Sequence, residues 1–262
     1  QDHSRAAALF EKACTAGDAS GCTRLGYQYG EGQGVAQDDA RAFRLFKLGC
    51  DGGDVRGCGN LGAMYQHGQG VTKDLAQAVA LYKKACDAGD MYHCANLGWM
   101  YQVGSGVPED DDKAEALMER ACDAGEPYGC YRLGGLYADR SDHDDAAESY
   151  QKACDGGHMA GCAALAYLYH EGFFIGKDLA RAATLYQKAC DAGLMRECTN
   201  YGRLLNEEGD HRQAVRLRTK ACDADWAFAC RELAENYLYG QGVSQSEEMA
   251  KKLLKKACDL GG

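Results

Sequence analysis

Hydrophobic residues recur along this chain at helical spacing, in short blocks separated by glycine-rich breaks. Leu97 and Tyr101 lie at i and i+4, which places them on one face of a helix. In the block before it, Ala78, Leu81 and Tyr82 lie at i, i+3 and i+4 and form the same kind of stripe. The pattern therefore predicts a chain of short amphipathic helices.

Polar and glycine positions predict where these helices begin and end. Asp74 is a suitable N-cap for one helix, and Gly89 supplies the left-handed residue that ends it. Asp90 then caps the following helix, which ends at a glycine-rich loop closed by Val107. We expect Val107 to tuck into the core. Each unit thus contains a first helix, called the A helix, a glycine-rich loop, a second helix, called the B helix, and a tight glycine turn.

A cysteine pair with seven intervening residues marks every unit. The first cysteines of the seven pairs lie 36, 36, 36, 32, 36 and 32 residues apart, and Cys258 follows after another 36, a period typical of stacked supersecondary units. The period predicts an all-α fold, an α/α superhelical solenoid of stacked helix-turn-helix repeats. The pairs are Cys14 and Cys22, Cys50 and Cys58, Cys86 and Cys94, Cys122 and Cys130, Cys154 and Cys162, Cys190 and Cys198, and Cys222 and Cys230.

The repeats extend over residues 1–262, which we expect to form a single solenoid of about seven repeats plus an incomplete terminal unit. The pattern predicts seven A helices and eight B helices. The two shorter spacings lack the glycine-rich loop, at residues 138–142 and 206–210. Because the sequence begins and ends on a B helix, we expect another A helix after Gly262. We also expect that an export signal has been removed before Gln1.

Each cysteine pair straddles the tight turn between a B helix and the next A helix. Across such a turn two cysteines can reach the Cα separation of roughly 5.5 Å that a disulfide needs. Zinc sites favour shorter spacings, and no histidine recurs in register. We therefore predict seven local disulfides rather than zinc sites or free thiols, with Cys258 unpaired. Disulfides imply an oxidising compartment, so we expect a secreted or periplasmic protein.

The charge and the remaining motifs exclude several classes of partner. The formal net charge is −10 and is spread over the repeats, so neither a nucleic-acid groove nor an anionic membrane is an expected partner. No stretch of about 18 apolar residues is present to span a membrane. The histidines show no ligand spacing and no nucleotide-binding motif occurs, so we predict no metal and no cofactor. We expect a monomer.

Two motifs recur in most units. Gly-Cys-x-x-Leu-Gly-x-x-Tyr-x-x-Gly-x-Gly-Val is nearly intact at residues 21–35 and 57–71, and Asp-x-Ala-x-Ala-x-x-Leu-Tyr-x-Lys-Ala-Cys occurs at 74–86 and 178–190. The chain resembles Sel-like repeat proteins, which are tetratricopeptide-related, and its cysteine pairs make it similar to the Helicobacter cysteine-rich protein branch. The resemblance implies an exported, non-catalytic scaffold that binds a protein or peptide. Some members of that branch are linked to binding penicillin-like compounds.

In tetratricopeptide relatives the A helices line a concave groove. Here the positions two and five residues after the second cysteine of each pair are expected to face away from the core. They carry aromatic, amide and guanidinium groups. Such groups suit an extended peptide backbone or a carboxylate, and aromatic faces supply rigid contact area. The predicted ligand-binding residues are Arg24, Tyr27, Asn60, Asn96, Trp99, Arg132, Tyr167 and Asn200. The alternative is that the aromatic residues simply pack on the adjacent repeat.

Two departures from the repeat give secondary candidates. Trp226, with Phe228 nearby, replaces the usual residues at a B-to-A turn, either as a contact site or as packing under a terminal unit. Phe173 and Phe174 replace part of a glycine-rich loop, either as a protrusion or as a plug in the core. We favour the plug, because Ile175 takes the place of the buried valine.

The penicillin link of the relatives raises hydrolysis as an alternative function. Ser149-Tyr-Gln-Lys152 matches the S-x-x-K element of penicillin-recognising enzymes, but the S-D-N and K-T-G elements are absent. Ser149 also falls in an ordinary B helix. We therefore predict a binding scaffold without catalytic residues, and keep a penicillin-binding or weak β-lactamase-like hydrolase as the alternative.

Overall fold

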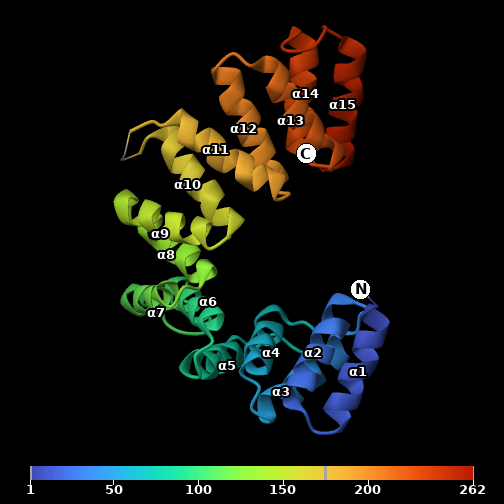
Figure 1. Cartoon of the computed structure of the whole chain (residues 1–262), viewed down its shortest axis with the longest axis vertical. Coiled ribbons are helices and arrows are strands. Elements are labelled where there is room, and N and C mark those ends of the chain that lie inside the picture. Colours follow the sequence, from blue (N-terminus) through green and yellow to red (C-terminus); the bar gives the residue numbers. More distant parts are fainter. Residues whose placement is uncertain (1, 174–175, 262) are drawn as a thin grey trace. The chain divides into compact units, whose positions relative to one another are not determined.

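The computed structural model describes residues 2–173 and 176–261. In these residues the chain folds into fifteen α-helices and no strand (Figure 1). The A helices are α2 (Ala19–Glu31), α4 (Val55–His67), α6 (Met91–Gln102), α8 (Pro127–Asp139), α10 (Met159–Glu171), α12 (Met195–Glu207) and α14 (Ala227–Tyr239). The B helices are α1 (His3–Thr15), α3 (Asp39–Asp51), α5 (Leu75–Asp87), α7 (Asp111–Asp123), α9 (His143–Asp155), α11 (Leu179–Asp191), α13 (His211–Asp223) and α15 (Glu247–Asp259).

The helices group into two compact units, Gln1–Leu136 and Tyr137–Gly262. In the first unit α2 packs on α3 and α4 on α5, and in the second α10 packs on α11 and α12 on α13. Each of these B helices also packs against the next A helix along the chain. Stacked helical hairpins of this kind confirm the α/α solenoid that the period predicts.

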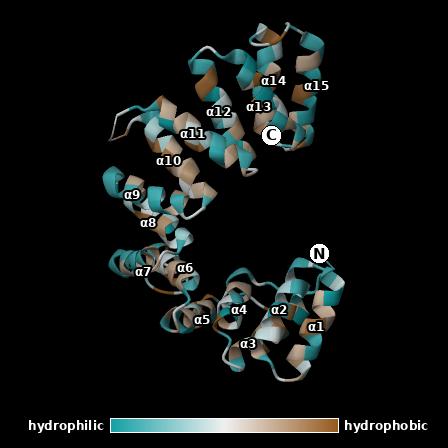
Figure 2. Ribbon diagram, viewed as in Figure 1, coloured by the Kyte–Doolittle hydropathy of each residue, from teal (hydrophilic) through white to brown (hydrophobic). Residues whose placement is uncertain are grey.

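Each helix packs through its hydrophobic side, and Figure 2 shows hydrophobic and hydrophilic positions alternating around the helices. Around α5 and α6 the core contains Tyr82, Leu97 and Met100, none more than 4% exposed. Gly98 lets α7 approach closely, because a Cβ added there would lie 3.0 Å from the carbonyl oxygen of Ala114. The small residue beside the hydrophobic stripe therefore sets the distance between the helices.

The predicted capping residues are present at the start of α5 and in the turn between α5 and α6. Asp74 Oδ1 accepts a hydrogen bond from the backbone N–H of Gln77 at 3.0 Å and begins α5. Gly89 adopts a φ of 95°, a conformation that favours glycine. Asp90 Oδ1 accepts from the backbone N–H of His93 at 3.2 Å and begins α6. The helix boundaries thus follow from local residues.

The glycine-rich loops that follow α2, α4 and α6 each contact the start of the preceding B helix. Gly106 has a φ of 77°, and a Cβ added to it would lie 2.6 Å from the carbonyl oxygen of Leu75. Gly34 and Gly70 approach the starts of α1 and α3 in the same way. Val107 is half-buried against the core around α5 and α6, as the sequence predicts.

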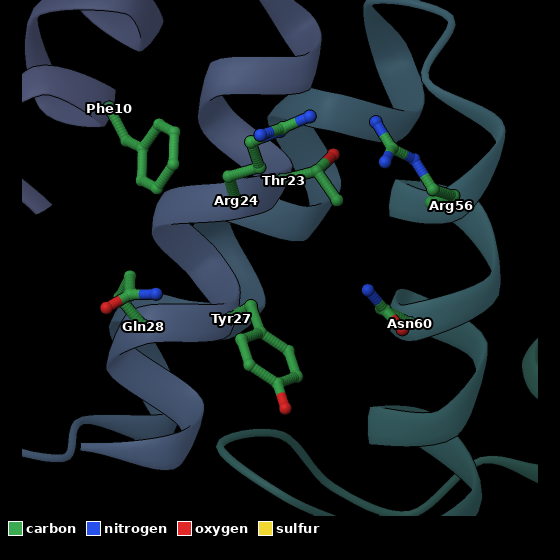
Figure 3. Close-up of a pocket in the computed structure, with 7 residues that line it drawn as sticks. All are labelled: Phe10, Thr23, Arg24, Tyr27, Gln28, Arg56 and Asn60. Atoms are coloured by element: carbon green, nitrogen blue, oxygen red, sulfur yellow. The ribbon is translucent and has the colours of Figure 1, made fainter. Parts of the chain in front are cut away.

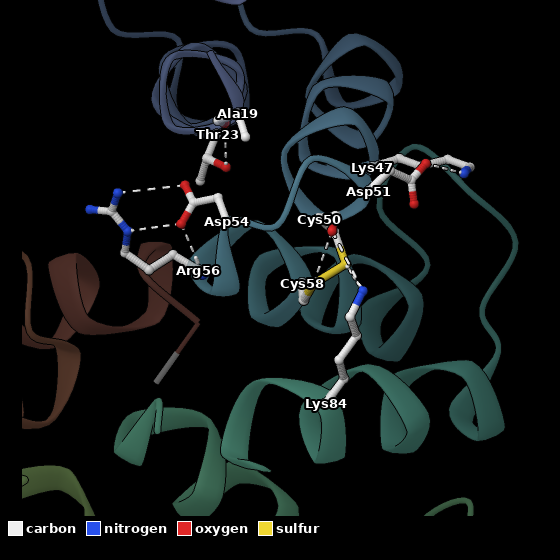
Figure 4. Close-up of a disulfide and its surroundings, with 9 residues drawn as sticks. All are labelled: Ala19, Thr23, Lys47, Cys50, Asp51, Asp54, Arg56, Cys58 and Lys84. Atoms are coloured by element: carbon white, nitrogen blue, oxygen red, sulfur yellow. Dashed lines mark hydrogen bonds and ion pairs between the residues drawn. A yellow bond between two sulfur atoms is a disulfide. The ribbon is translucent and has the colours of Figure 1, made fainter. Parts of the chain in front are cut away.

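All seven predicted disulfides are present, and each joins the end of a B helix to the first turn of the next A helix. Figure 4 shows one of them, between α3 and α4. The bonds join Cys14 to Cys22, Cys50 to Cys58, Cys86 to Cys94, Cys122 to Cys130, Cys154 to Cys162, Cys190 to Cys198, and Cys222 to Cys230. Cys258, in α15, is exposed and forms no disulfide.

The paired cysteines lie closer together than the sequence analysis expected. Their Cα–Cα distances are 4.4–4.7 Å, compared with the roughly 5.5 Å anticipated, and fall at the short end of the range that disulfides adopt. The reason is that each tight turn brings the adjoining helix ends into direct contact. Closing so short a loop contributes about 2–3 kcal/mol in the chain-entropy model.

A basic side chain links consecutive disulfide turns. Lys84 Nζ lies 3.5 Å from both the carbonyl oxygen and Sγ of Cys50 (Figure 4). Lys256 Nζ donates to the carbonyl oxygen of Cys222 at 2.7 Å. A cation at the C-terminal end of a helix satisfies free carbonyl groups and opposes the helix dipole. The basic residue two positions before a cysteine therefore holds one repeat on the next.

Candidate functional site

Three of the predicted ligand-binding residues line one cavity in the first unit. Arg24 and Tyr27 project from α2 and Asn60 from α4 into a cavity of about 340 Å³ (Figure 3). The other lining residues are Phe10, Thr23, Gln28 and Arg56. The structure thus brings together side chains that lie a full repeat apart in the sequence. We call this space the α2/α4 cavity.

The two arginines of the α2/α4 cavity differ in their partners. Arg56 Nε lies 3.3 Å from Asp54 Oδ1, and Arg56 Nη2 donates to Ser20 Oγ at 3.0 Å. Arg24 is exposed, and its guanidinium lies 5.7 Å from the ring centroid of Phe10. No described carboxylate pairs with Arg24. One guanidinium group of the cavity is therefore free to meet an anionic group of a ligand.

The inner wall of the α2/α4 cavity is polar where the next two A helices are apolar. Gln28 is 8% exposed, at the position that Met64 and Met100 occupy in the next two A helices. Its Oε1 is buried and has no hydrogen-bond partner within the described chain. Thr23 is also buried, and its hydroxyl donates to the carbonyl oxygen of Ala19 at 3.2 Å. The unsatisfied acceptor is thus enclosed behind the wall of the cavity and does not open into it.

An aromatic stack occupies the next part of the A-helix surface, on α6 and α8. The guanidinium of Arg132 lies 5.4 Å from the ring centroid of Trp99 and 5.0 Å from that of Tyr128. The rings of Tyr128 and Tyr92 lie 4.8 Å apart. Arg132 Nε also donates to the hydroxyl of Tyr128 at 2.6 Å. We call Tyr92, Trp99, Tyr128 and Arg132 the aromatic stack.

Asn96 lies beside the aromatic stack and is held by it. Its Nδ2 donates to the carbonyl oxygen of Tyr92 at 3.2 Å, and its Oδ1 accepts from the hydroxyl of Tyr128 at 3.3 Å. Burial raises the pKa of Tyr128, and the nearby Arg132 opposes that shift without cancelling it. The neutral phenol therefore remains a hydrogen-bond donor, and the stack is rigid before any ligand binds.

In the second unit, Tyr167 on α10 is half exposed and forms an aromatic contact of its own. The ring centroid of Phe173 lies 5.7 Å from that of Tyr167 and 5.2 Å from that of His143. Phe173 itself is 49% exposed, so one side of its ring packs while the other remains open. Phe174 and Ile175, on which the plug hypothesis depends, lie outside the described residues.

Asn200, on α12, is turned toward a buried carboxylate. Its Nδ2 donates to Glu197 Oε2 at 2.8 Å, and Arg196 Nε donates to Glu197 Oε1 at 2.7 Å. Glu197 is 1% exposed. Since the amide N–H of Asn200 is already used, this residue offers a ligand less than Asn60 does.

A buried polar network that the sequence analysis did not single out lies between α13 and α14. Arg218 is 5% exposed; its Nη1 donates to Asn236 Oδ1 at 2.6 Å, and its Nη2 lies 2.8 Å from Glu232 Oε2. With its amide oriented to satisfy both ends, Asn206 also accepts from Arg218 Nη1 at 2.7 Å. Burial raises the pKa of Glu232, while Arg218 opposes the shift. We call these four residues the Arg218 network.

The second candidate turn is partly exposed. Trp226 is the N-cap residue of α14 and is 38% exposed, as is Phe228. The guanidinium of Arg231 lies 4.6 Å from the ring centroid of Phe228. The two rings therefore present apolar surface at the turn.

The serine considered for catalysis is not accessible. Ser149 lies within α9 and is 5% exposed, so a bulky amide substrate cannot approach its hydroxyl. Lys152, the lysine of the S-x-x-K match, forms an ion pair with Glu148 at 2.9 Å. Among the described residues no cluster of His, Cys, Asp and Glu is arranged to hold a metal ion, and no helix is long and apolar enough to cross a membrane.

Tyr92, Tyr128 and Arg56 were missed by the sequence analysis, which considered positions after each cysteine. These three residues stand two positions before the second cysteine of a pair, where other units have Ser, Ala, Arg or Phe. This position varies as strongly as those of the predicted row, and the same variation could have identified it. Gln28 could have been found as a polar residue at a position that the next five repeats fill with Met or Leu.

The sequence profile of the Sel1 repeat matches residues 1–18, 19–54, 55–90, 94–126, 127–158, 160–194 and 227–262. The chain therefore belongs to the Sel1 repeat family. Proteins built from this tetratricopeptide-like repeat are typically protein-interaction scaffolds and are generally non-catalytic. A comparison with proteins of curated function gives no match.

A comparison with solved structures gives similar proteins from several bacteria. The chain is similar to c5321, a protective antigen present in uropathogenic Escherichia coli strains, with a TM-score of 0.73 and 28% identity over 98% of this chain. It spans 56% of the length of that protein. A Sel1 repeat protein from Oxalobacter formigenes has a TM-score of 0.67 and 25% identity, covering 96% of this chain and 92% of its own. Helicobacter pylori cysteine rich protein B is 29% identical, with a TM-score of 0.41, over 49% of this chain and 92% of its own.

Proposed function

We propose that this protein is an exported, non-catalytic scaffold that binds a protein or peptide through the surface of its A helices. The observation that carries the proposal is the α2/α4 cavity, where Arg24, Tyr27 and Asn60 converge from two A helices. The aromatic stack adds a second contact area on α6 and α8 in the same unit. Exposed rings beside guanidinium groups are the residue types that dominate binding energy at protein interfaces.

The mixture of groups favours a polypeptide ligand over a small apolar molecule. Amide and guanidinium groups can pair with the backbone and acidic side chains of an extended segment, while the rings cover its apolar side chains. The aromatic stack is held by internal hydrogen bonds, so binding loses little side-chain entropy. A rigid surface of this kind suits repeated contacts along one peptide.

The seven disulfides support export. Local disulfides persist in oxidising compartments, whereas cytosolic thiols are kept reduced. The fourteen paired cysteines are mostly buried and stabilise every B-to-A turn. Periplasmic expression should yield seven disulfides by non-reducing peptide mapping, and a fully reduced protein recovered from its native compartment would contradict export.

Peptide selection tests the binding function directly. Short random peptides displayed on phage are selected on the oxidised protein, and the enriched peptides are measured by fluorescence anisotropy. We expect the double variant Asn96→Ala/Trp99→Ala to bind them about tenfold or more weakly, because a central contact is worth about 1–3 kcal/mol.

The matched control changes two exposed residues on the B helix α3. Leu48 and Arg44 lie on the first unit but away from the A-helix surface, so Leu48→Ala/Arg44→Gln should leave the affinity unchanged. Circular dichroism verifies that both variants keep their helices. Weakening by the α3 variant alone, or no enriched peptide at all, would place the function elsewhere.

A further inference from the structure

The A helices of the first unit carry almost no acidic residues, although the chain is acidic overall. The chain has 39 Asp and Glu residues against 29 Lys and Arg residues, and a formal net charge of −10. Across α2, α4, α6 and α8 as far as Leu136, the Lys, Arg, Asp and Glu residues are Arg24, Arg56, Arg132 and, at the last position of α2, Glu31. These helices therefore carry a net positive charge, which attracts an anionic ligand that most of the remaining surface repels.

The acidic residues that precede these four helices are engaged in capping. Each accepts a hydrogen bond of 3.0–3.3 Å from a backbone N–H in the first turn of its own helix; they are Asp18, Asp54, Asp90 and Glu126. Of the three arginines, Arg56 pairs with the carboxylate of Asp54 at 3.3 Å. Arg24 and Arg132 have ring contacts and no carboxylate partner among the described residues. Two guanidinium groups on the A helices are therefore uncompensated.

The guanidinium of Arg132 is held in place before a ligand binds. It lies 5.4 Å from the ring centroid of Trp99 and 5.0 Å from that of Tyr128, and its Nε donates to the hydroxyl of Tyr128 at 2.6 Å. Its two Nη groups form no hydrogen bond with the described residues, and neither atom is enclosed, so both can be reached from solvent. The fork that pairs with a carboxylate is therefore oriented and open.

Arg24 occupies the same repeat position as Arg132, two residues after the second cysteine of a pair. Because the two helices share the repeat geometry, the arginines lie on corresponding sides of α2 and α8. An exposed ring accompanies each of them: Tyr27 lies one turn after Arg24 and is 50% exposed, and Tyr92 packs on Tyr128 and is 47% exposed. The surface thus combines two separate groups for anions with two exposed rings.

Resting on the function proposed above, we propose that the A-helix surface of the first unit binds an extended acidic polypeptide segment, in which carboxylate side chains at two separate positions pair with Arg132 and Arg24. Complementary charge favours this ligand, because both cations are uncompensated in a protein that is otherwise acidic. A chain terminus supplies only one carboxylate, so acidic side chains are needed for two arginines. Nucleic acid carries a charge at every nucleotide and depends on many basic contacts, which this surface does not offer.

The second unit supplies a matched control. Its A helices carry acidic residues before their last positions, namely Glu197, Glu232 and Glu235. Arg203 is exposed on α12, in the same unit as these carboxylates. Replacing Arg203 therefore removes an arginine from an A helix without touching the surface of the first unit.

The experiment is a selection of random displayed peptides on the wild type, on Arg24→Gln/Arg132→Gln and on Arg203→Gln. We expect Asp or Glu at two fixed positions in peptides enriched on the wild type and on Arg203→Gln, and no acidic preference on the double variant. Circular dichroism verifies that all three proteins keep their helices. No acidic enrichment on the wild type, or an unchanged preference on the double variant, would overturn the proposal.

Double-mutant cycles then assign the two pairs with one enriched peptide. Replacing one acidic residue by its amide should weaken binding about tenfold where it pairs with the oriented Arg132, and about threefold where it pairs with the exposed Arg24. Each loss should disappear only in the matching single variant, Arg132→Gln or Arg24→Gln. Arg132→Lys keeps the charge without the fork and should recover only part of the affinity. Losses that persist in both single variants would contradict the pairing.

Further arms separate this inference from the broader function. If amidation of the peptide C-terminus removes binding while the acidic side chains are dispensable, the surface recognises a chain terminus and the inference is wrong. It is equally wrong if a random single-stranded oligonucleotide displaces the peptide and itself binds through Arg24 and Arg132. If enriched peptides depend on Trp99 and on neither arginine, the scaffold function remains and the inference fails. If no peptide is enriched over a surface without protein, both proposals fail.

Discussion

The regions around α5/α6 and α13/α14 use the same repeat positions in opposite ways. Around α5/α6 the B helix carries Tyr82, which is 2% exposed and lies in the same core as Met100. The hydroxyl of Tyr82 donates a hydrogen bond to Gln66 Oε1 at 2.6 Å. Asn96, two positions after the cysteine, remains on the A-helix surface beside Trp99. This region has an apolar core and an outer surface available to a ligand.

Around α13/α14 each of these positions is polar and joins the Arg218 network. Arg218 stands where α5 has Tyr82, and Asn236 stands where α6 has Met100. Glu232 occupies the position of Asn96, yet its side chain is 14% exposed and pairs inward with Arg218. The repeat backbone therefore accepts either an apolar or an ionic core. Where the core is ionic, a position that lies on the A-helix surface elsewhere becomes part of the interior.

The largest expected effect comes from breaking the Arg218 network at one member. Glu232→Met leaves a buried guanidinium without its carboxylate, and removing one partner of a buried ion pair costs about 3 kcal/mol or more. Urea unfolding under non-reducing conditions measures this loss of free energy of unfolding.

Replacing the whole network is the control for that variant. Arg218→Tyr, Glu232→Asn, Asn236→Met and Asn206→Gln together install the residues of the α5/α6 region, and should recover most of the lost stability. A loss below about 1 kcal/mol for Glu232→Met would show that Arg218 does not depend on its carboxylate. No recovery in the fourfold variant would show that the two regions differ beyond these positions.

A smaller effect is expected from the side-chain hydrogen bond of Tyr82. Tyr82→Phe removes the hydroxyl that donates to Gln66 and should cost about 1 kcal/mol of unfolding free energy. Tyr186, at the same position of α11, donates to no described side chain and provides the control. Tyr186→Phe should be close to neutral, and equal losses in both variants would contradict the role of Gln66.

The smallest expected effect is a difference in pH dependence between two buried carboxylates. Burial tends to raise the pKa of Asp90, but hydrogen bonds from His93 outweigh it and hold the pKa below its ordinary value. Its contribution to stability is therefore present above the unfolded pKa of about 3.9 and is lost as the pH falls through the folded pKa. Glu232 has the opposite shift, because burial outweighs Arg218 and raises its pKa.

The contribution of Glu232 is thus largest below its unfolded pKa of about 4.3 and declines as the pH rises through the folded pKa. Stability of the wild type relative to Asp90→Asn should rise with pH across the acidic range. Stability of the wild type relative to Glu232→Gln should fall. Urea midpoints measured between about pH 2.5 and 6.5 test this, and slopes of equal sign would contradict it.

The fold was predictable because each repeat encodes it locally. Capping residues such as Asp74 and Asp90, left-handed glycines such as Gly89 and the fixed cysteine spacing act within one turn or one hairpin. Their repetition predicted the helix count, the order of helices and all seven disulfides. Local signals of this kind do not depend on which distant residues come together.

The candidate site was predictable only in part. Arg24, Tyr27 and Asn60 do line one cavity, and Trp99 and Arg132 do lie together. The periodic rule placed Arg24 and Tyr27 on the exposed side of α2, whereas Trp99 packs partly against the core around α5 and α6. It did not reveal which groups would already be paired, and it missed the partners supplied two positions before a cysteine.

By itself the sequence determined the solenoid, its disulfide pairing and the surface on which variation concentrates, since these depend on spacing within one repeat. Tertiary structure alone decided which polar groups remain available. Asn96 and Asn200 are held by neighbours on their own or adjacent helices, Glu232 is drawn inward by Arg218, and Gln28 retains an unsatisfied oxygen enclosed behind the cavity wall. Hydrogen-bond satisfaction depends on contacts between repeats, and those contacts exist only once neighbouring helices have packed.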